Sequence, residues 1–285
     1  MKRYLWIFAV LPFLWSCIAE DRSACPQPRG VSVRMSVCPD PMTAVTHAAD
    51  EEAIRDLNLY LLDADRNVVL HRYQSSPTLR FECLPGDYLL RIAANMGRDT
   101  GDSPAWENLA VTHADDYDTL PMAYEGEVSI PSSDETVTLP TVEVQRVVAK
   151  VTYNISVAPD AGDIRLHSVQ PVNLPARMPV FDPGLRAAEY TAGEIVGSSS
   201  QTLMGTFYML PNLQGEVPSI ADQRDKGPAN APADATFLRI RALRGSKVLD
   251  YYIYPGGNNT SNFDIRANTH YRLDIMTVSY THLRA

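Results

Sequence analysis

The chain has 285 residues, an apolar fraction of 45% and a formal net charge of −9, a composition typical of a globular protein with a sizeable core. The negative charge argues against a nucleic-acid partner and against adhesion to anionic lipid through a basic patch. Beyond the N-terminal segment, no apolar run approaches the roughly 20 residues that span a bilayer, so we expect no transmembrane helix.

Residues 1–16 have the plan of a secretory signal peptide, with a basic start followed by a short and almost wholly apolar run. Leu14, Ser16 and Cys17 resemble the lipobox of bacterial lipoproteins, in which the cysteine thiol receives a diacylglycerol and becomes the first residue after cleavage. Trp15 departs from that pattern, because a small residue is usual there. The alternative is an ordinary secreted protein with a chance cysteine at the cleavage site.

An acidic tether is expected after this cysteine, over residues 17–28. Glu20 and Asp21 resemble the surface-export signal that sends lipoproteins of some Gram-negative gut and oral anaerobes to the outer face of the outer membrane. A solvated tether without a signal is the alternative. Several acyl chains on Cys17 would anchor the chain stably, because each buried CH₂ contributes about 0.8 kcal/mol. We therefore expect an outer-membrane lipoprotein at the cell surface.

Apolar and polar residues alternate along most of the chain after residue 29, which predicts half-buried strands. The stretch GVSVRMSVC is the first such strand, with its valines and methionine on one face and its serines and arginine on the other. Turn residues between apolar runs predict β-hairpins. Three hairpins are expected, over residues 57–73, 79–95 and 127–140.

The clearest strand is VVAKVTYNISV, at residues 147–157. Its apolar residues have the opposite parity to Val142 and Val144, and a one-residue phase change turns the buried face of a strand over. We therefore expect a bulge or a passage from one sheet to another near Arg146. The sequence predicts a domain boundary here, between an N-terminal domain over residues 29–144 and a C-terminal domain over residues 145–277.

The second half continues as short strands bounded by Pro, Gly and Asn clusters, without helical patterns between them, which predicts an all-β protein built from β-sandwiches. A polar loop rich in Pro and Gly is expected within residues 214–233. Residues 278–285 break the alternation of the last strand and are interpreted as a non-native tail. The native part of this sequence is then expected to stop near Thr277, with the real tail of the protein missing from it.

No motif in the sequence supports catalysis, and neither G-x-S-x-G nor H-E-x-x-H is present. Asp63, Asp65 and Asn67 have the first spacings of a calcium loop, but Val68 stands where that loop requires glycine. A solvated hairpin turn is the better interpretation. The six histidines are dispersed without metal-ligand spacing. We expect neither an enzyme nor a metal site nor a cofactor.

Three cysteines remain once Cys17 is assigned to lipid, namely Cys25, Cys38 and Cys83. Export permits disulfides, and Cys38 ends one predicted strand while Cys83 lies in another, so these two are a candidate pair. Unpaired, half-buried thiols are an equally good interpretation.

Segments along nearly the whole chain resemble, in order, the fimbrillin family, whose members build the type V pili of the same anaerobes. GVSVRMSV, LNLYLLDADRNVV and LPGDYLLRIAANMG resemble the first domain of that family. VQRVVAKVTYNISV resembles the strand that opens the second domain, and YYIYPGGNNTSNFDIRANTHYRLDI resembles its closing hairpin. The resemblance implies two tandem transthyretin-like β-sandwich domains and a shaft, tip or anchor subunit of a fimbria that serves adhesion to a host surface ligand.

In that family an arginine-specific protease removes an N-terminal strand, and the groove that it leaves accepts a strand from the next subunit. Physically this is β-augmentation, in which another chain completes an exposed ladder of backbone groups. Here the strand would be residues 31–37, with Arg29, Arg34 and Arg55 as candidate cut sites. Arg55 ranks first because it precedes the next strand. The implied partners are other fimbrial subunits, and the outer membrane through the lipid.

A surface glycan-binding lipoprotein, acting alone or with an uptake system, is the alternative function from another class. Such sites usually need exposed aromatic platforms, and after the signal peptide the only tryptophan is Trp106. Tyr251, Tyr252 and Tyr254 are close in sequence, but side chains alternate between the faces of a strand, so at least one should lie in the core.

Overall fold

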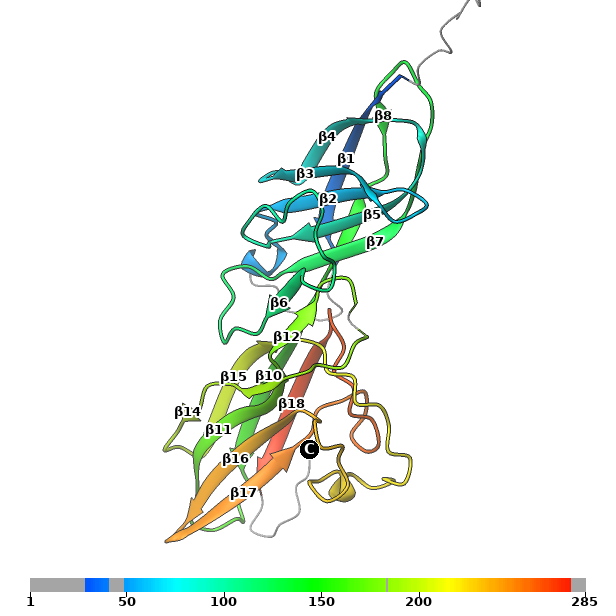
Figure 1. Ribbon diagram of the computed structural model, residues 1–285. Helices are drawn as coiled ribbons and strands as arrows, with labels where there is room; N and C mark the ends of the chain where they lie inside the picture. The colour runs from blue at the N-terminus through cyan, green and yellow to red at the C-terminus, as the bar shows by residue number, and fades with distance from the viewer. Residues whose placement is uncertain (1–28, 41–48, 183, 278–285) are drawn as a thin grey trace, which may run out of the picture.

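The computed structural model describes residues 29–40, 49–182 and 184–277, and its architecture is nearly all β, as the sequence predicts (Figure 1). Two short 3₁₀ turns, η1 (Ala49–Glu52) and η2 (Gln223–Asp225), are the helical elements of these residues. No helix in the described ranges is long and apolar enough to cross a membrane.

The strands fall into two groups that stand end to end (Figure 1). The first group consists of β1 (Val31–Pro39), β2 (Leu57–Leu62), β3 (Val68–Gln74), β4 (Thr78–Cys83), β5 (Gly86–Ala94), β6 (Ala110–Thr112), β7 (Met122–Ile130), β8 (Val137–Thr138) and β9 (Val142–Arg146). The second consists of β10 (Ala149–Val157), β11 (Ile164–Pro175), β12 (Arg177–Pro179), β13 (Tyr190–Ala192), β14 (Val196–Gly197), β15 (Thr202–Met209), β16 (Phe237–Arg244), β17 (Lys247–Ile253) and β18 (His270–Thr277).

The first group forms one sheet in the order β3-β2-β5-β7-β9-β1-β4, with β8 also paired to β1. Buried side chains from both ends of this order, such as Leu59 on β2 and Val33 on β1, belong to a single core. The sheet therefore closes around its own apolar face, and the alternation read from the sequence of β1 places that strand in the closure.

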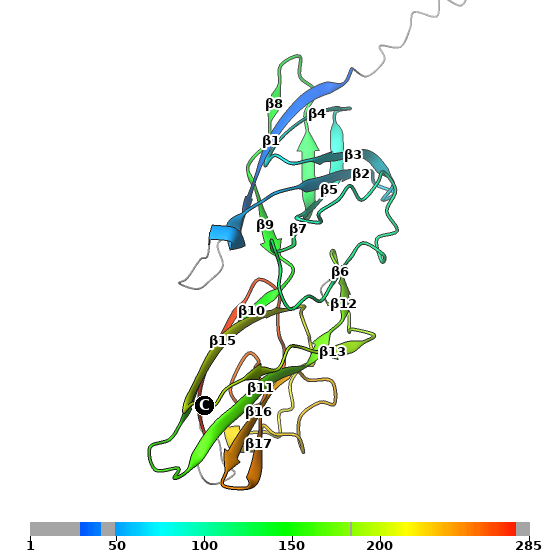
Figure 2. The same ribbon diagram turned by 90° about the vertical axis from the view of Figure 1, so that its left-hand side faces the viewer.

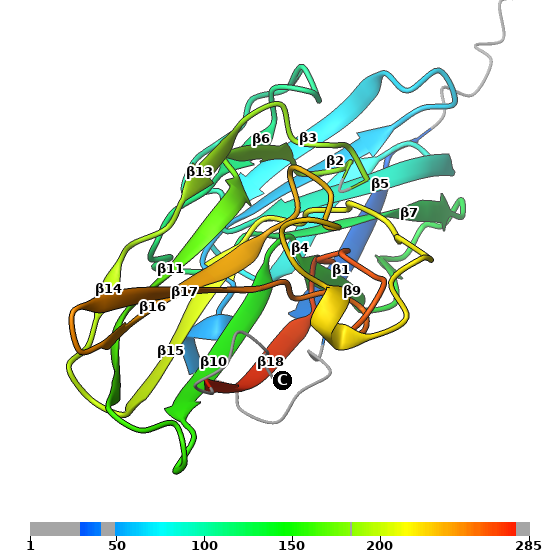
Figure 3. The same cartoon turned by 90° about the horizontal axis from the view of Figure 1, so that it is seen from below.

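The second group contains two sheets, one in the order β15-β10-β18 and one in the order β13-β11-β16-β17, shown from below in Figure 3. Ile155 and Ile275 from the first sheet and Val169 and Ile240 from the second share one buried core. β18 pairs in parallel with β10, and the closing segment of the chain is therefore not a hairpin with β17.

The chain passes from the first group to the second where the alternation changes phase. β9 ends at Arg146 in one sheet, β10 begins at Ala149 in another, and only Val147 and Val148 lie between them. A short ribbon of β6 with β12 joins the groups at a second place. The division into sandwich domains over residues 29–144 and 145–277 stays a prediction.

One of the three expected hairpins is present, and two are wrong. β2 pairs with β3 across the turn at Asp63, whose carboxylate accepts the backbone N–H groups of Asp65 at 3.0 Å and Asn67 at 2.8 Å. β4 and β5 are both strands, but β4 pairs with β1 while β5 lies between β2 and β7. Likewise β7 pairs with β5, and β8 with β1. The turns after β4 and β7 carry the chain to another part of the sheet.

Candidate functional site

β1 lies inside the sheet, with partners along both of its edges (Figure 2). It pairs antiparallel with β4, from Val31 opposite Cys83 to Ser36 opposite Thr78. On its other edge it pairs in parallel with β8 and then β9. The inward-facing residues Val31, Val33, Met35 and Val37 are 2, 0, 1 and 5% exposed.

The slot that β1 fills could not remain empty. Burial of a side chain of this size contributes about 1.5–3 kcal/mol, so the four together contribute roughly 6–12 kcal/mol. That sum is comparable with the whole stability of an ordinary domain, about 5–15 kcal/mol. Loss of β1 would also leave the backbone groups of β4, β8 and β9 unpaired. A replacement strand with the same alternation of apolar and polar residues would restore both the apolar burial and the backbone pairing.

The three candidate cut sites differ in accessibility. Arg29 is exposed just before β1, whereas Arg34 lies within β1, opposite Arg80 on one side and Thr138 on the other. The side chain of Arg55 is exposed. A protease needs an extended, freely accessible backbone, which the sheet denies at Arg34.

Asn95 holds the backbone around Arg55. The N–H group of Arg55 donates to Asn95 Oδ1 at 2.8 Å, and the N–H group of Asn95 donates to the carbonyl of Asp56 at 2.9 Å. The side-chain amide of Asn95 donates to the Ala53 carbonyl at 2.8 Å. Cleavage after Arg55 therefore requires this segment to open first.

We use the name strap for Asp40 and residues 49–56, the described part of the connection between β1 and β2. Glu51 of the strap is buried and accepts hydrogen bonds from Lys150 Nζ and Tyr208 Oη, both at 2.6 Å. Burial acts to raise the pKa of the Glu51 carboxyl, but the hydrogen bonds from Lys150 and Tyr208 outweigh it, and the pKa is lowered. The strap is thereby fixed to the second group of strands.

Arg146 holds the other end of the strap. Its guanidinium is 1% exposed and donates to the Asp40 carbonyl at 2.9 Å and the Glu51 carbonyl at 3.1 Å. It also donates to Asn268 Oδ1 at 3.3 Å, and the Asn268 amide donates to Asp40 Oδ2 at 2.9 Å. Sequence reasoning missed this network, because Glu51 and Asp40 lie in a segment without periodicity.

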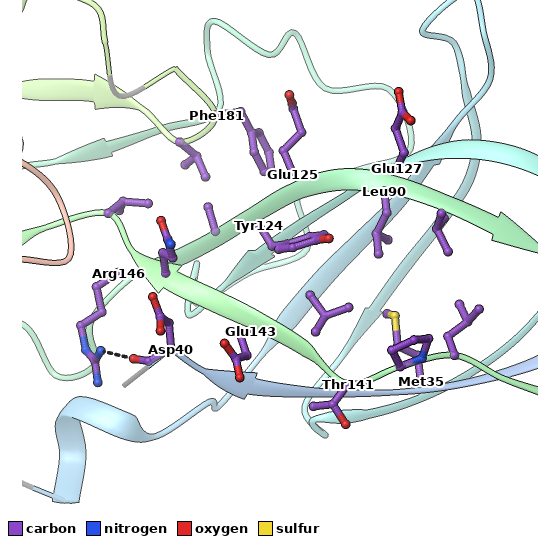
Figure 4. A pocket seen from close by; sticks show the side chains of 18 of the residues that line it. Met35, Asp40, Leu90, Tyr124, Glu125, Glu127, Thr141, Glu143, Arg146 and Phe181 are labelled. Atoms are coloured by element: carbon purple, nitrogen blue, oxygen red, sulfur yellow. Dashed lines mark hydrogen bonds between the residues drawn. The ribbon is translucent and has the colours of Figure 1, made fainter. Parts of the chain in front are cut away.

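A crevice of about 630 Å³ opens beside β1, between β7 and β9 (Figure 4). The two strands pair only where Met122 and Ala123 lie opposite Arg146 and Gln145, and then they diverge. Apolar side chains line the floor of the crevice and acidic side chains stand at its rim. The floor includes Met35, Leu90, Tyr124, Val128 and Leu139, and the rim includes Glu125, Glu127 and Glu143.

Tyr124 lies along β7 inside this crevice, pointing toward Leu90 and Met35 (Figure 4). A Cβ atom on Gly126 would be 2.7 Å from Cζ of the Tyr124 ring, and closer still to its hydroxyl. Glycine at this position is therefore what lets the ring lie flat against the strand.

The candidate disulfide is not present. Cys38 and Cys83 are both free thiols: Cys38 lies near the end of β1, whereas Cys83 on β4 lies opposite Val31 at the start of that strand. Seven residues of strand separate Val31 from Cys38, or about 23 Å, far beyond the Cα spacing of a disulfide. Burial raises the pKa of both thiols, and the nearby carboxylates of Glu143 and Asp40 add to the effect at Cys38.

Several predicted sites lie outside the described residues and stay predictions. They are the signal peptide, the lipid-attachment residue Cys17, Cys25, the export signal at Glu20 and Asp21, and the tail at residues 278–285. Within the described ranges, no group of three or more His, Cys, Asp and Glu side chains could hold a metal ion.

The aromatic residues that a glycan site would need are mostly engaged in packing. Trp106 meets Tyr60 and Phe181 edge to face, with ring centroids 5.1 and 5.6 Å apart, and the Arg91 guanidinium lies 4.4 Å from the centre of its ring. Tyr251 is buried, as the alternation of its strand predicts for at least one of the three tyrosines.

Tyr252 and Tyr254 line a smaller crevice, of about 250 Å³, beside β17 and β18. Lys226 borders it, but its ammonium group donates to the carbonyls of Asn258 at 2.7 Å and Asn262 at 2.8 Å. Burial lowers the pKa of Lys226 to about 8. This cation therefore holds the loop before β18.

Solved structures of fimbrial proteins have the same fold. The tip fimbrial protein Mfa3 from Porphyromonas gingivalis, with a C-terminal truncation, superposes with a TM-score of 0.63 at 15% identity, over 90% of this chain and 98% of that one. A fimbrilin (fimA) from Porphyromonas gingivalis W83 gives 0.60 at 13% identity, over 88% and 91%. A fimbrial assembly protein from Parabacteroides distasonis ATCC 8503 gives 0.54 at 13%, over 90% and 94%.

The sequence comparisons reach less of the chain. A family described as Domain of unknown function (DUF4906) matches residues 207–275, and no curated protein matches the sequence. The structural likeness defines the class: this chain has the fold of the fimbrial proteins of Bacteroidales. The resemblance to fimbrillins is confirmed at the level of the fold.

Proposed function

We propose that the protein is a structural subunit of a cell-surface fimbria, assembled by donation of a β-strand from one subunit to the next. The observation that carries this proposal is the position of β1, which lies between β9 and the terminal strand β4, is buried along one face and is joined to the rest of the sheet through the strap. The fold shared with tip, fimbrilin and assembly proteins supports it.

In this proposal the chain is exported as a lipoprotein with Cys17 acylated, and Glu20 and Asp21 direct it to the outer face of the outer membrane. Cleavage after Arg55 then releases β1 together with most of the strap. A strand from a neighbouring subunit enters the slot, its alternate apolar side chains replacing Val33 and Met35. A subunit that keeps β1 would act as an anchor or terminator.

Asn95 would limit the rate of cleavage, because its hydrogen bonds fix the backbone on both sides of Arg55 and must open before a protease can bind there. Opening of this segment breaks those bonds while leaving β1 in its ladder. Cleavage can thus precede release of the strand, and the slot stays filled until a replacement arrives.

Treatment of the purified chain with an arginine-specific protease tests the proposal, with Arg55→Lys and Arg29→Lys as matched variants. We expect the wild-type and the Arg29→Lys chains to form ladders of stable multimers on gels run without boiling. We expect Arg55→Lys to remain a monomer, because lysine preserves the positive charge but an arginine-specific protease does not cleave after it. Ladders of equal intensity from Arg55→Lys would refute cleavage there, and a monomer that binds polysaccharide would favour a glycan-binding lipoprotein.

A further inference from the structure

One backbone edge of β7 has no strand beside it over most of its length. β7 pairs with β5 from Met122 opposite Ala94 to Ile130 opposite Gly86. On its other edge only Met122 and Ala123 pair, with β9. Among the residues that the structure describes, the edge from Tyr124 to Ile130 therefore offers N–H and C=O groups without a ladder partner. Seven strand residues span about 23 Å.

This edge differs from the outer edges of β3 and β4, because it borders a crevice with an apolar floor. Met35 and Leu90, which are 1% and 2% exposed, lie at the bottom of the crevice, and Tyr124, Val128 and Leu139 also line it. An added strand would gain backbone hydrogen bonds along one side and apolar contacts on one face.

The rim of the crevice is acidic. Glu125 is neutralised by Arg91, with 2.6 Å between Nε and Oε2. Glu127 on β7 and Glu143 on β9 are exposed, and neither forms an ion pair within the described part of the chain. The side chains of Glu125 and Glu127 point away from the crevice floor (Figure 4). They would lie beside the outward-facing residues of an added strand.

We infer that the crevice between β7 and β9 is a second strand-docking site, whose partner is an extended segment of another protein chain with alternating apolar and basic residues. The apolar residues enter the crevice toward Met35 and Leu90, and the lysines or arginines face Glu127 and Glu143. Charge complementarity of this kind selects the partner and speeds its association. The site exists with β1 in place, so it does not depend on cleavage or on the proposed function.

Two synthetic nine-residue peptides, acetylated and amidated, test this inference with the full chain. One alternates valine with lysine, and the other alternates valine with glutamate. We expect the lysine peptide to protect from hydrogen exchange those backbone amides of residues 124–130 that point away from β5, toward the free edge. We expect it to bind about tenfold more tightly than the glutamate peptide, since each favourable exposed charge pair adds a small increment and each unfavourable pair removes one.

A charge-reversed variant separates pairing from non-specific attraction. In Glu127→Lys/Glu143→Lys the preference should reverse toward the glutamate peptide, while Glu82→Lys, which changes an exposed strand residue of β4, should keep the wild-type preference. Circular dichroism checks that each variant is folded. Absence of protection with both peptides, equal binding of the two, or protection at β3 or β4 instead of β7 would overturn the inference.

Discussion

The carboxylate of Glu51 accepts a hydrogen bond from the ammonium group of Lys150 at 2.6 Å, and both side chains are less than 10% exposed, at 7% and 9%. Glu51 belongs to the strap that follows β1, and Lys150 belongs to β10, the first strand of the second group. The segment that would leave with β1 is thus also a contact between the two groups of strands. Its removal would leave Lys150 buried without the carboxylate that it faces, and Arg146 buried without the two carbonyl groups to which it donates.

Removal of one partner of this buried ion pair should be costly. We expect Glu51→Gln to lower the free energy of unfolding by about 3–5 kcal/mol, because Lys150 would remain buried without a counter-charge. The double variant Glu51→Leu/Lys150→Met should recover most of that loss. Urea denaturation of the three chains measures the effect, and a single variant within 0.5 kcal/mol of wild type would contradict a buried pair.

The same pair should make stability depend on pH on the acid side. The pKa of Glu51 is lowered in the folded chain, so its contribution is fully present above the unfolded value, about 4.3, and is lost as the pH falls through the folded value. The melting temperature of wild type should therefore fall more steeply than that of Glu51→Gln below about pH 4. Parallel curves for the two chains would show that Glu51 is not ionised against Lys150.

The burial pattern of β1 predicts a large loss of stability from a substitution at one position and almost none at a nearby one. Met35→Ala should lower the free energy of unfolding by about 2–5 kcal/mol, since it removes a fully buried side chain from the core. Ser32→Ala, on the exposed face of the same strand, should change it by less than about 0.5 kcal/mol. Equal effects in chemical denaturation would mean that β1 does not occupy the slot in solution.

Gly126 should tolerate a side chain only when Tyr124 is shortened. Gly126→Ala places a Cβ against the Tyr124 ring, and the displacement should lower the free energy of unfolding by about 1–3 kcal/mol. In a Tyr124→Ala background the same substitution should be nearly neutral. Gly227→Ala, where a Cβ would meet nothing within 4 Å, serves as the control. Additive losses in the double variant would argue against the ring lying over Gly126.

Alternation in the sequence was enough to predict most strands and the all-β class, because burial of one face imposes a period of two. It also placed the passage between sheets near Arg146. It could not predict which strands pair: the same apolar pattern suits β5 whether its neighbour is β4 or β2, and register and partner depend on long-range packing.

The strap network is where sequence reasoning could not reach. Lys150 has the parity of the polar residues of its strand, yet it is buried, and its ammonium group donates to Glu51 of the strap. Glu51 and Lys150 are 99 residues apart, so no local spacing signals their contact. The crevice was missed for a similar reason, since it arises from the divergence of β7 and β9.

The N-terminal residue of subunits taken from assembled fibres tests the central claim most directly. N-terminal sequencing should show chains that begin at Asp56, because cleavage after Arg55 is proposed to free the slot of β1 for a neighbouring strand. Fibres in which every subunit still begins at Cys17, with β1 retained, would contradict strand donation at this slot.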